Sequence, residues 1–329
     1  MNYIGIDISK DSFVAAYSHE KGSKTQTYKN TPEGVRKFIK TIDREQHHCV
    51  MEATGNYCFL LLYMLIKQGY KASLINPKQI KYFAKTTLSV TKTDAQDAIL
   101  LSLYGKSFEP PIYKMPSESI IFLKQKRTVI RQLKKQRVAS ENLKKSIDVL
   151  PYKDKKTLKI LTKTITFLNN QINNIEKEFF DVATTEFNKQ ISLLTSIKGI
   201  GMAVATSLII ATGGFSFFDN PKQISRYIGI CPTYQHSGTS VNIKGAINRN
   251  GDTALRSTMF LAAITAIRCN SACKEFYTNL RAKGKPAKLA IIAVANKLIR
   301  QAFAIIKSET PYKDGFVSKV PNQHQLGCA

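Results

Sequence analysis

The sequence predicts an α/β domain of ribonuclease H-like order, followed by a long helical connector and a mostly helical carboxy-terminal part. Three observations predict this: alternating strand and helix patterns over residues 1–108, a sustained seven-residue apolar repeat after residue 158, and glycine turns between apolar helices after residue 187. The length of 329 residues suits two or more domains. With 43% hydrophobic residues the chain can bury a substantial core, which excludes wholesale disorder.

The first 108 residues alternate between strand and helix signals. Strands are expected at Tyr3–Asp7, Phe13–Tyr17, Thr25–Tyr28, His48–Ala53 and Lys71–Asn76. Helices are expected at Thr31–Ile42, at Tyr57–Gln68 and from Asp94 onward. Three strands, a helix, and then strand, helix, strand and helix are the order expected of a ribonuclease H-like domain.

The connector contains an apolar repeat that is typical of a coiled coil. Its apolar positions alternate in steps of three and four residues and are Leu158, Leu161, Ile165, Leu168, Ile172, Ile175, Phe179 and Val182. A weaker repeat lies upstream on a very basic helix, and Pro151 separates the two. We expect two long helices, and the apolar seam is buried either within a hairpin of this chain or by self-association.

The carboxy-terminal part contains a glycine turn between apolar helices. The helices are expected at Ile191–Ser196, Met202–Thr212, Lys222–Ile228, Asp252–Cys269 and Pro286–Lys307. The turn Gly199-Ile200-Gly201 has the pattern of a helix-hairpin-helix, whose backbone N–H groups can bind a DNA phosphate. Glycines that merely allow a tight turn between helices are the structural alternative.

Lysine and arginine outnumber the acids by a wide margin. The chain has 49 Lys and Arg against 23 Asp and Glu, a formal net charge of +26. A surplus of this size exceeds what solubility requires and predicts nucleic acid as a partner. The net charge is +6 over residues 1–108, +11 over 122–163, −2 over 164–190 and +12 over 191–329. Nucleic-acid backbones are therefore expected on the first connector helix and the carboxy-terminal part.

The sequence predicts neither secretion nor a membrane span. The amino end lacks the basic and apolar regions of a signal peptide, and the longest strongly apolar run, Phe59–Ile66, is far shorter than a spanning helix. The six cysteines include no CxxC pair, and Cys269 and Cys273 lie in an apolar helical stretch typical of a core. We expect a cytoplasmic protein with reduced thiols.

Acidic residues are scarce, so acids that end buried strands are informative. The acids concerned are Asp7 at the end of the first strand, Glu52 at the end of the fourth, and Asp94 and Asp97 on one face of the last helix. These three elements converge in a ribonuclease H-like sheet. Four converging carboxylates raise one another's pKa unless a cation compensates them. Ligation by oxygen alone suits Mg²⁺ or Mn²⁺, and two ions would assist displacement at a phosphodiester.

Each acid alone also has an ordinary structural explanation. Asp94 is a typical acid at a helix N-terminus, where the helix dipole favours it. Asp7 can cap a turn with Ser9, and Glu52 can end a surface strand. The occurrence of all four in this topological order favours the metal site.

A polar segment rich in hydroxyl groups follows the glycine turn. It consists of Cys231–Ser240 (CPTYQHSGTS), which Lys244–Asp252 (KGAINRNGD) follows after three residues. These residue types predict an exposed loop, a basic turn and a capped helix, which together can hold a phosphate beside a nucleophile. From spacing alone Ser237 does not differ from any other loop serine.

One combination of residues covers nearly the whole chain. It consists of Asp7, Glu52, the segment Lys92–Asp97 (KTDAQD) and the block Gly229…Pro232…Ser237-Gly238…Gly251…Leu255-Arg256. The combination resembles the DEDD transposases of bacterial insertion sequences, a family that includes the Piv invertase and the bridge-RNA-guided recombinases. The resemblance implies a RuvC-like catalytic domain over residues 1–108, a basic coiled-coil connector over 109–186, a transposase domain over 187–315 and a tail over 316–329.

The resemblance also implies roles for the matched residues. The tetrad that binds the metal ions in the family matches Asp7, Glu52, Asp94 and Asp97. Ser237 matches the nucleophile, and Ser240 is a nearby alternative that the sequence leaves open. Attack by serine forms a phosphoserine ester and frees a 3′ hydroxyl, which conserves the bond energy for religation. The chain has Arg249 where the family usually has lysine, so a bidentate phosphate contact would replace a point charge.

The partners implied are donor and target DNA, a structured bridge RNA from the non-coding end of the element, and further copies of the chain in a dimer or tetramer. In a bacterium such an enzyme would lie in the cytoplasm at the nucleoid. Contacts with nucleic acid are expected at Lys126, Arg127, Arg131, Lys134, Lys135, Lys198, Gly199, Gly201, Lys244, Arg249 and Arg256.

Three functional hypotheses follow. The first is an RNA-guided, metal-dependent serine recombinase, in which the connector allows Ser237 of one protomer to meet the acids of another. The second is a RuvC-like structure-specific DNA endonuclease, in which the acids activate water through metal and Ser237 is incidental. The third is a basic DNA- or RNA-binding protein with an inactive nuclease fold.

Overall fold

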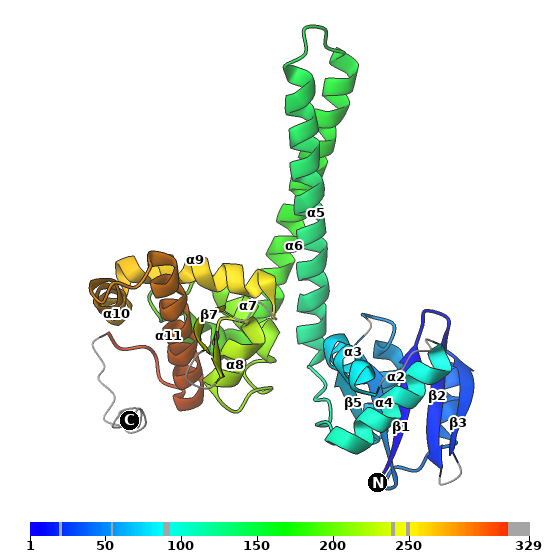
Figure 1. Ribbon diagram of the computed structural model, residues 1–329. Coiled ribbons are helices and arrows are strands. Elements are labelled where there is room, and N and C mark those ends of the chain that lie inside the picture. Colours follow the sequence, from blue (N-terminus) through cyan, green and yellow to red (C-terminus); the bar gives the residue numbers. More distant parts are fainter. Residues whose placement is uncertain (20–21, 54, 88–92, 238–240, 248–250, 315–329) are drawn as a thin grey trace. The chain divides into compact units, whose positions relative to one another are not determined.

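The chain divides into two units, Met1–Met115 and Pro116–Ala329. The computed structural model describes residues 1–314 except 20–21, 54, 88–92, 238–240 and 248–250 (Figure 1). The predicted break at Pro110 and Pro111 lies just before the boundary, and these residues remain attached to the first unit. The Ser73 hydroxyl donates a hydrogen bond to the Pro111 carbonyl at 2.7 Å. The predicted divisions at 186/187 and 315/316 remain predictions.

The first unit is built on a mixed five-stranded sheet. The strands are β1 (Asn2–Ile8), β2 (Ser12–His19), β3 (Gly22–Lys29), β4 (His47–Glu52) and β5 (Lys71–Ile75). The helices are α1 (Pro32–Ile39), α2 (Phe59–Lys67), α3 (Pro77–Thr86) and α4 (Asp94–Phe108). The strand order is β3-β2-β1-β4-β5, in which β1 is antiparallel to β2 and parallel to β4. The α/β fold predicted for this part is therefore confirmed.

Helices cover both faces of this sheet. On one face Ile4, Ile6 and Ile8 of β1 pack with apolar residues of α1 and α2. On the other face α4 lies over β1 and β2, and α3 and α4 share a small core with β4 and β5 that includes Ile80 and Leu101. The prediction omitted α3. The sequence contains its start signal, because the Asn76 side chain accepts a hydrogen bond from the Lys78 amide at 2.9 Å and Pro77 follows the cap.

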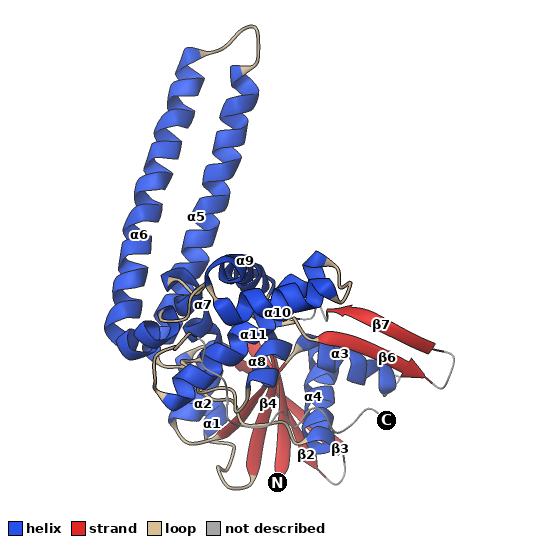
Figure 2. Cartoon of the chain, turned by 90° about the vertical axis from the view of Figure 1, so that its left-hand side faces the viewer, coloured by secondary structure: helices blue, strands red, loops and turns tan. Residues whose placement is uncertain are grey.

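Two long antiparallel helices open the second unit. They are α5 (Glu118–Asp148) and α6 (Lys155–Thr195), which lie side by side (Figures 1 and 2). The apolar seam of α6 faces α5, and its residues Leu168, Ile172 and Phe179 are buried. The hairpin within one chain thus accounts for the burial of these seam residues. Non-helical backbone at Phe187 marks a kink where the carboxy-terminal part was expected to begin.

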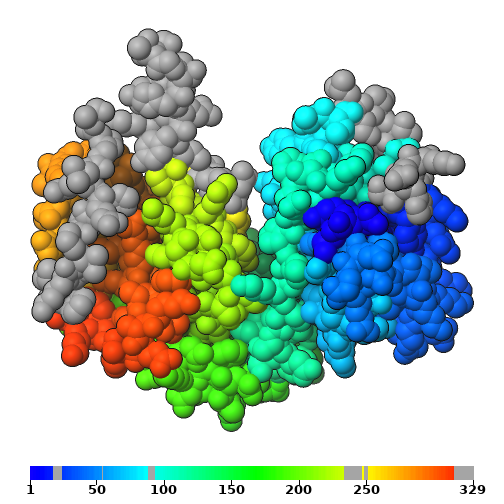
Figure 3. All heavy atoms as spheres, turned by 90° about the horizontal axis from the view of Figure 1, so that it is seen from below, coloured from blue at the N-terminus to red at the C-terminus, as the bar shows by residue number. Residues whose placement is uncertain are grey.

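The rest of the second unit is a helical bundle with one β-hairpin. Its elements are α7 (Met202–Thr212), α8 (Pro221–Ile228), β6 (Pro232–Ser237), β7 (Val241–Ile247), α9 (Thr253–Cys269), α10 (Ser271–Ala282) and α11 (Ala287–Ser308). Helices α8 and α11 lie side by side (Figure 3), and the Ser225 hydroxyl donates to the Asn296 side chain at 3.2 Å. The polar segment expected as a loop forms the hairpin β6–β7, and α10 was not predicted.

Helix α11 is the one helix of the described chain with the length and apolar composition that a membrane span requires. Its residues Val294, Leu298 and Ile299 are fully buried in the core of the second unit. These residues lie on the side of α11 that packs against α8 and α9, as one face of a helix in a protein core does.

Candidate active site

Two neighbouring parallel strands bring Asp7 and Glu52 to the same edge of the sheet. Strands β1 and β4 are in register with Ile6 opposite Met51, so the next residue on each strand is one of the two acids. Side chains alternate along a strand, and Ile6 and Ile8 point into the core with α1 and α2. Asp7 therefore projects from the opposite face, which α4 covers.

Helix α4 lies directly on β1 because Gly5 has no side chain. A Cβ atom at Gly5 would be 1.9 Å from the Ala98 carbonyl oxygen and 2.3 Å from the Ser102 nitrogen. The Ser102 hydroxyl donates to the Tyr3 carbonyl at 2.6 Å, which adds a direct bond between helix and strand. This close backbone contact fixes the helix over the strand that carries Asp7.

The first turn of α4 supplies the other two acids. Thr93 caps the helix by accepting a hydrogen bond from the Gln96 amide at 3.2 Å. Asp94 and Asp97 follow within that turn, where Asp94 is exposed and Asp97 is partly buried. Both carboxylates thus lie at the N-terminal end of α4, beside the sheet.

The other three acids influence the electrostatics of Asp7. Burial first, and then the negative charges of Asp94, Asp97 and Glu52, together raise the pKa of Asp7 to about 6. The backbone N–H of Ile8 opposes this shift by hydrogen bonding to the carboxylate. Negative charge at this edge of the sheet therefore lacks full compensation.

The donor set suits a divalent cation. Within the described ranges, no three carboxylate, imidazole or thiol groups are close enough to hold one ion as they stand. The raised pKa of Asp7 nevertheless indicates a site where added positive charge is favourable. Carboxylate oxygens are the ligands that Mg²⁺ and Mn²⁺ prefer, so the residues fit such an ion chemically.

Sequence reasoning missed Asn30, which links the two segments that follow Asp7 and Glu52. Its side-chain Nδ2 donates to the Ser9 carbonyl at 3.0 Å and to the Tyr57 carbonyl at 3.0 Å. Its backbone N–H donates to the Asp11 carbonyl at 2.9 Å. The turn after β1 is thereby tied to the loop after β4. An asparagine before a helix cap carries no sequence signal of this role.

Ser237 lies at the end of strand β6. The hairpin pairs Ser237 with Val241 and Pro232 with Ile247, so Ser237 is the last paired residue before the turn. Lys244 lies on β7 opposite Tyr234. Ser240 and Arg249 lie outside the described residues, and so do the side chains of residues 233–246.

The residues that flank the hairpin close its base against the end of α8. Gly229 ends α8 in the left-handed conformation with φ 77°. Gly251 approaches the same turn so closely that a Cβ atom would be 2.5 Å from the Tyr227 carbonyl oxygen. The Arg256 guanidinium donates to the Ile228 carbonyl at 3.1 Å. Arg256, expected to contact nucleic acid, therefore anchors the protein backbone.

The two glycines of the helix-hairpin-helix pattern differ in their structural roles. Gly199 has φ 104°, and a Cβ atom there would be 2.6 Å from the Ala266 Cβ. Gly201 has ordinary extended backbone before α7, and a Cβ atom there would meet open space. The turn requires glycine at position 199, whereas packing does not require it at 201.

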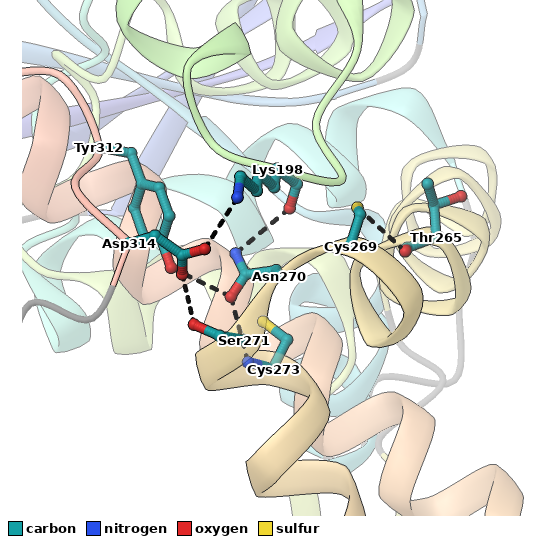
Figure 4. Close-up of polar contacts among 8 residues, drawn as sticks. All are labelled: Lys198, Thr265, Cys269, Asn270, Ser271, Cys273, Tyr312 and Asp314. Atoms are coloured by element: carbon teal, nitrogen blue, oxygen red, sulfur yellow. Dashed lines mark hydrogen bonds and ion pairs between the residues drawn. The ribbon is translucent and has the colours of Figure 1, made fainter.

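Lys198 is held by the end of the described chain (Figure 4). Its Nζ lies 2.8 Å from Oδ2 of Asp314 in an ion pair, and Asp314 also accepts a hydrogen bond from Ser271. The buried Asn270 donates to the Lys198 carbonyl at 3.2 Å and accepts from the Tyr312 hydroxyl at 3.1 Å. The predicted phosphate contact at Lys198 therefore competes with a carboxylate of the same chain.

The basic residues of the connector fall into two groups. Lys126 is paired with Glu178, and Lys134 with Glu176 at 2.6 Å, so the acids of α6 neutralise them. Arg131 and Lys135 are exposed and take part in none of the ion pairs within the described chain. The positive charge that α5 can offer to a partner is thus smaller than its number of lysines and arginines suggests.

Comparisons with known proteins agree on one family. Residues 4–150 match a DEDD-type IS110 family model described as Transposase, and residues 191–278 match the Transposase IS116/IS110/IS902 family. The Pilin gene-inverting protein of Moraxella bovis is 34% identical over 320 residues, which cover 94% of this chain and 97% of that relative. The Transposase for insertion sequence element IS1111A of Coxiella burnetii is 23% identical, with 95% and 91% covered. The chain therefore belongs to the IS110 family of DEDD transposases.

Proposed function

We propose that this transposase cleaves and exchanges DNA strands through a phosphoserine link at Ser237, with Mg²⁺ or Mn²⁺, as two ions, at the four acids. The acids are Asp7, Glu52, Asp94 and Asp97. The observation that carries the proposal is the register of β1 and β4, which ends both strands in an acid, together with the close contact of β1 with α4, whose first turn carries Asp94 and Asp97. A structured RNA from the mobile element guides the enzyme to donor and target DNA.

The reaction proceeds by displacement at phosphorus. The Oγ of Ser237 forms a bond to a DNA phosphate while the bond between phosphorus and the 3′ oxygen breaks. The proton of Ser237 is transferred, in the balance, to the departing 3′ oxygen, which leaves as a hydroxyl. In the reverse step, the 3′ hydroxyl of the exchanged strand attacks the phosphoserine and releases Ser237. This reseals the DNA without ATP. When bound, the ions supply Lewis-acid stabilisation of charge on the phosphate.

The chain's own residues provide position and charge control. Gly5 and Ser102 hold α4 on β1, and Asn30 ties the two segments that follow the strand acids. At the other predicted centre, Gly251 and Arg256 close the base of the hairpin that ends at Ser237. The acids and Ser237 belong to different units, so the proposal includes a composite site made from two protomers.

The decisive experiment is a search for protein covalently joined to DNA. The full chain with its co-purified RNA is incubated with end-labelled, site-bearing DNA and Mg²⁺, and products are separated under denaturing conditions. We expect an adduct that Ser237→Ala and Asp7→Ala abolish and that Ser240→Ala retains. Cleavage without an adduct would instead support the endonuclease that uses water, and adduct formation after removal of the RNA would contradict guidance.

Mixed protomers test the composite site. Asp7→Ala and Ser237→Ala each remove one centre, so neither variant alone forms the adduct. A mixture of the two restores it if one protomer contributes Ser237 and another contributes the acids. A mixture as inactive as either variant would contradict assembly in trans.

A further inference from the structure

Helix α3 has one apolar face and one basic face. On the apolar face Ile80 is buried, and the Phe83 ring packs edge-on against Tyr104 of α4 with centroids 5.4 Å apart. The opposite face is made of Lys78, Lys81, Tyr82 and Lys85, which we call the α3 face. Their spacing of three, one and three residues places all four on one side of the helix. Packing therefore fixes which side faces outward.

The α3 face presents an aromatic ring between cations. Tyr82 is 67% exposed, a large fraction for a tyrosine on an ordered helix. Lys78 precedes it by one helical turn and Lys85 follows by nearly one, so the lysines extend about 10 Å along the helix on both sides of the ring. Such a combination is typical of surfaces that bind the backbone and the bases of single strands.

The positive charge of the first unit is concentrated in the segment that contains α3. Residues 53–93 contain six lysines and no acid, which equals the whole net charge of +6 over residues 1–108. On α2, the Lys67 ammonium lies 5.5 Å from the centroid of the Tyr63 ring. This cation therefore already makes a cation–π contact within the protein. Lys81 and Lys85 take part in none of the ion pairs of the described chain.

The α3 face begins at the edge of the sheet that carries Glu52. Helix α3 begins directly after Asn76, which follows β5, and Ile75 of β5 pairs with Glu52 of β4. The carboxyl ends of parallel strands meet at one edge of a sheet, so α3 starts at the edge that carries Glu52. Its Phe83 packs against Tyr104 and Phe108 in the second half of α4, so Lys78 at the start of α3 is the part of the face nearest to Glu52.

We propose that the α3 face binds an unpaired stretch of DNA next to the cleavage site. Tyr82 stacks on one base, and Lys81 and Lys85 contact the flanking phosphates. Strand exchange, the activity under Proposed function on which this inference rests, requires that bases near the cut leave their duplex. In a duplex the faces of the bases are covered by their neighbours. An exposed aromatic ring can therefore stack on a base of an unpaired strand but not on a base within a duplex.

Binding measurements without metal separate this inference from the chemistry of Ser237. Full-length protein freed of RNA is titrated in EDTA against fluorescein-labelled single-stranded DNA and against duplex, over a series of salt concentrations. We expect Tyr82→Ala to weaken single-strand binding by about tenfold and to leave duplex binding unchanged. Lys81→Gln with Lys85→Gln should reduce the salt slope for the single strand by up to about 1.4.

A matched control removes the same charge elsewhere in the first unit. Lys67→Gln with Lys71→Gln lowers the net charge by two on residues away from α3, and we expect an unchanged slope for the single strand. An equal loss in both double variants would mean that only total charge matters and would overturn the proposal. An equal effect of Tyr82→Ala on duplex and single strand would overturn the stacking role.

A crosslink locates the contact directly, even where other surfaces bind the same strand. DNA containing 5-bromodeoxyuridine is irradiated with the wild-type protein, and tryptic peptides are examined by mass spectrometry. We expect an adduct on the peptide Tyr82–Lys85, which trypsin releases by cutting after Lys81 and after Lys85. The proposal is wrong if crosslinks form only on other peptides. It is also wrong if this peptide crosslinks to an RNA of the same sequence and not to the DNA. Loss of the Ser237 adduct with this crosslink intact would contradict only the proposed chemistry.

Discussion

The two predicted catalytic centres are supported in different ways. The four acids lie on regular elements in close backbone contact, since Gly5 lets α4 rest on β1. Ser237 lies at the far end of a two-stranded hairpin, and the described contacts that secure this hairpin are at its base, through Gly251 and Arg256. A site that must hold like charges together needs a rigid frame, whereas a nucleophile that must reach DNA can lie on a projecting element.

Filling the space at Gly5 is expected to have the largest effect. In Gly5→Val the new atoms collide with the backbone of Ala98 and Ser102, so α4 must move away from β1. We expect a loss of about 3 kcal/mol or more in the free energy of unfolding, with loss of cleavage. Thermal unfolding followed by circular dichroism measures it. Gln96→Ala, an exposed change on the same helix, is the control, and equal stability of the two variants would contradict the close contact.

Removing Arg256 tests the support of the hairpin. Arg256→Ala deletes the hydrogen bond to the Ile228 carbonyl, and we expect a loss of about 1–3 kcal/mol in stability. If the role is structural, the salt slope of DNA binding does not change. The exposed Arg268→Ala, on the same helix, should change stability by less than about 0.5 kcal/mol. A slope reduced by about 0.9 with normal stability would instead identify Arg256 as a phosphate contact.

The difference between the two centres also explains what the sequence could predict. Asp7 and Glu52 end strongly apolar strands, so their place in a sheet follows from local pattern and strand order. The hairpin at Ser237 has few β-branched residues on its first strand, and its role was inferred only from a family resemblance. Asn30 and the pairing of Lys198 with Asp314 depend on contacts between segments that are distant in sequence, which no local pattern contains. Helix α3 was missed although Asn76 and Pro77 form a start signal.

A smaller effect is expected from pH, through the contribution of Asp7 to the stability of the first unit. The folded-state pKa of Asp7, about 6, exceeds its ordinary value of 3.8, so the folded protein binds this proton more tightly than the unfolded chain. Without metal, stability therefore falls as pH rises from about 4 through 6 and is constant above. Asp7→Asn removes this dependence and should raise Tm at pH 7.5 by about 2–4 °C, the effect of ~1 kcal/mol after discounting for partial exposure.

Thermal unfolding in EDTA between pH 4.5 and 7.5 measures this difference. Asp219→Asn, an exposed change in the second unit, controls for the loss of one negative charge and should follow the wild type. Addition of Mg²⁺ at pH 7.5 should stabilise the wild type more than Asp7→Asn, because a cation compensates the charge that the substitution removes. Parallel curves for Asp7→Asn and the wild type would mean that the acids do not interact as the structure indicates.

The smallest effect distinguishes two groups of cations on one helix. Lys126 and Lys134 are paired with glutamates of α6, whereas Arg131 and Lys135 are not paired within the described chain. Removing two charges from either group changes net charge equally, so only phosphate contacts separate them. We expect Arg131→Gln with Lys135→Gln to reduce the salt slope of nucleic-acid binding by up to about 1.8, and Lys126→Gln with Lys134→Gln by less than half of that. Equal slopes would mean that the glutamates release their lysines when nucleic acid binds, and the hairpin would then offer its full basic face.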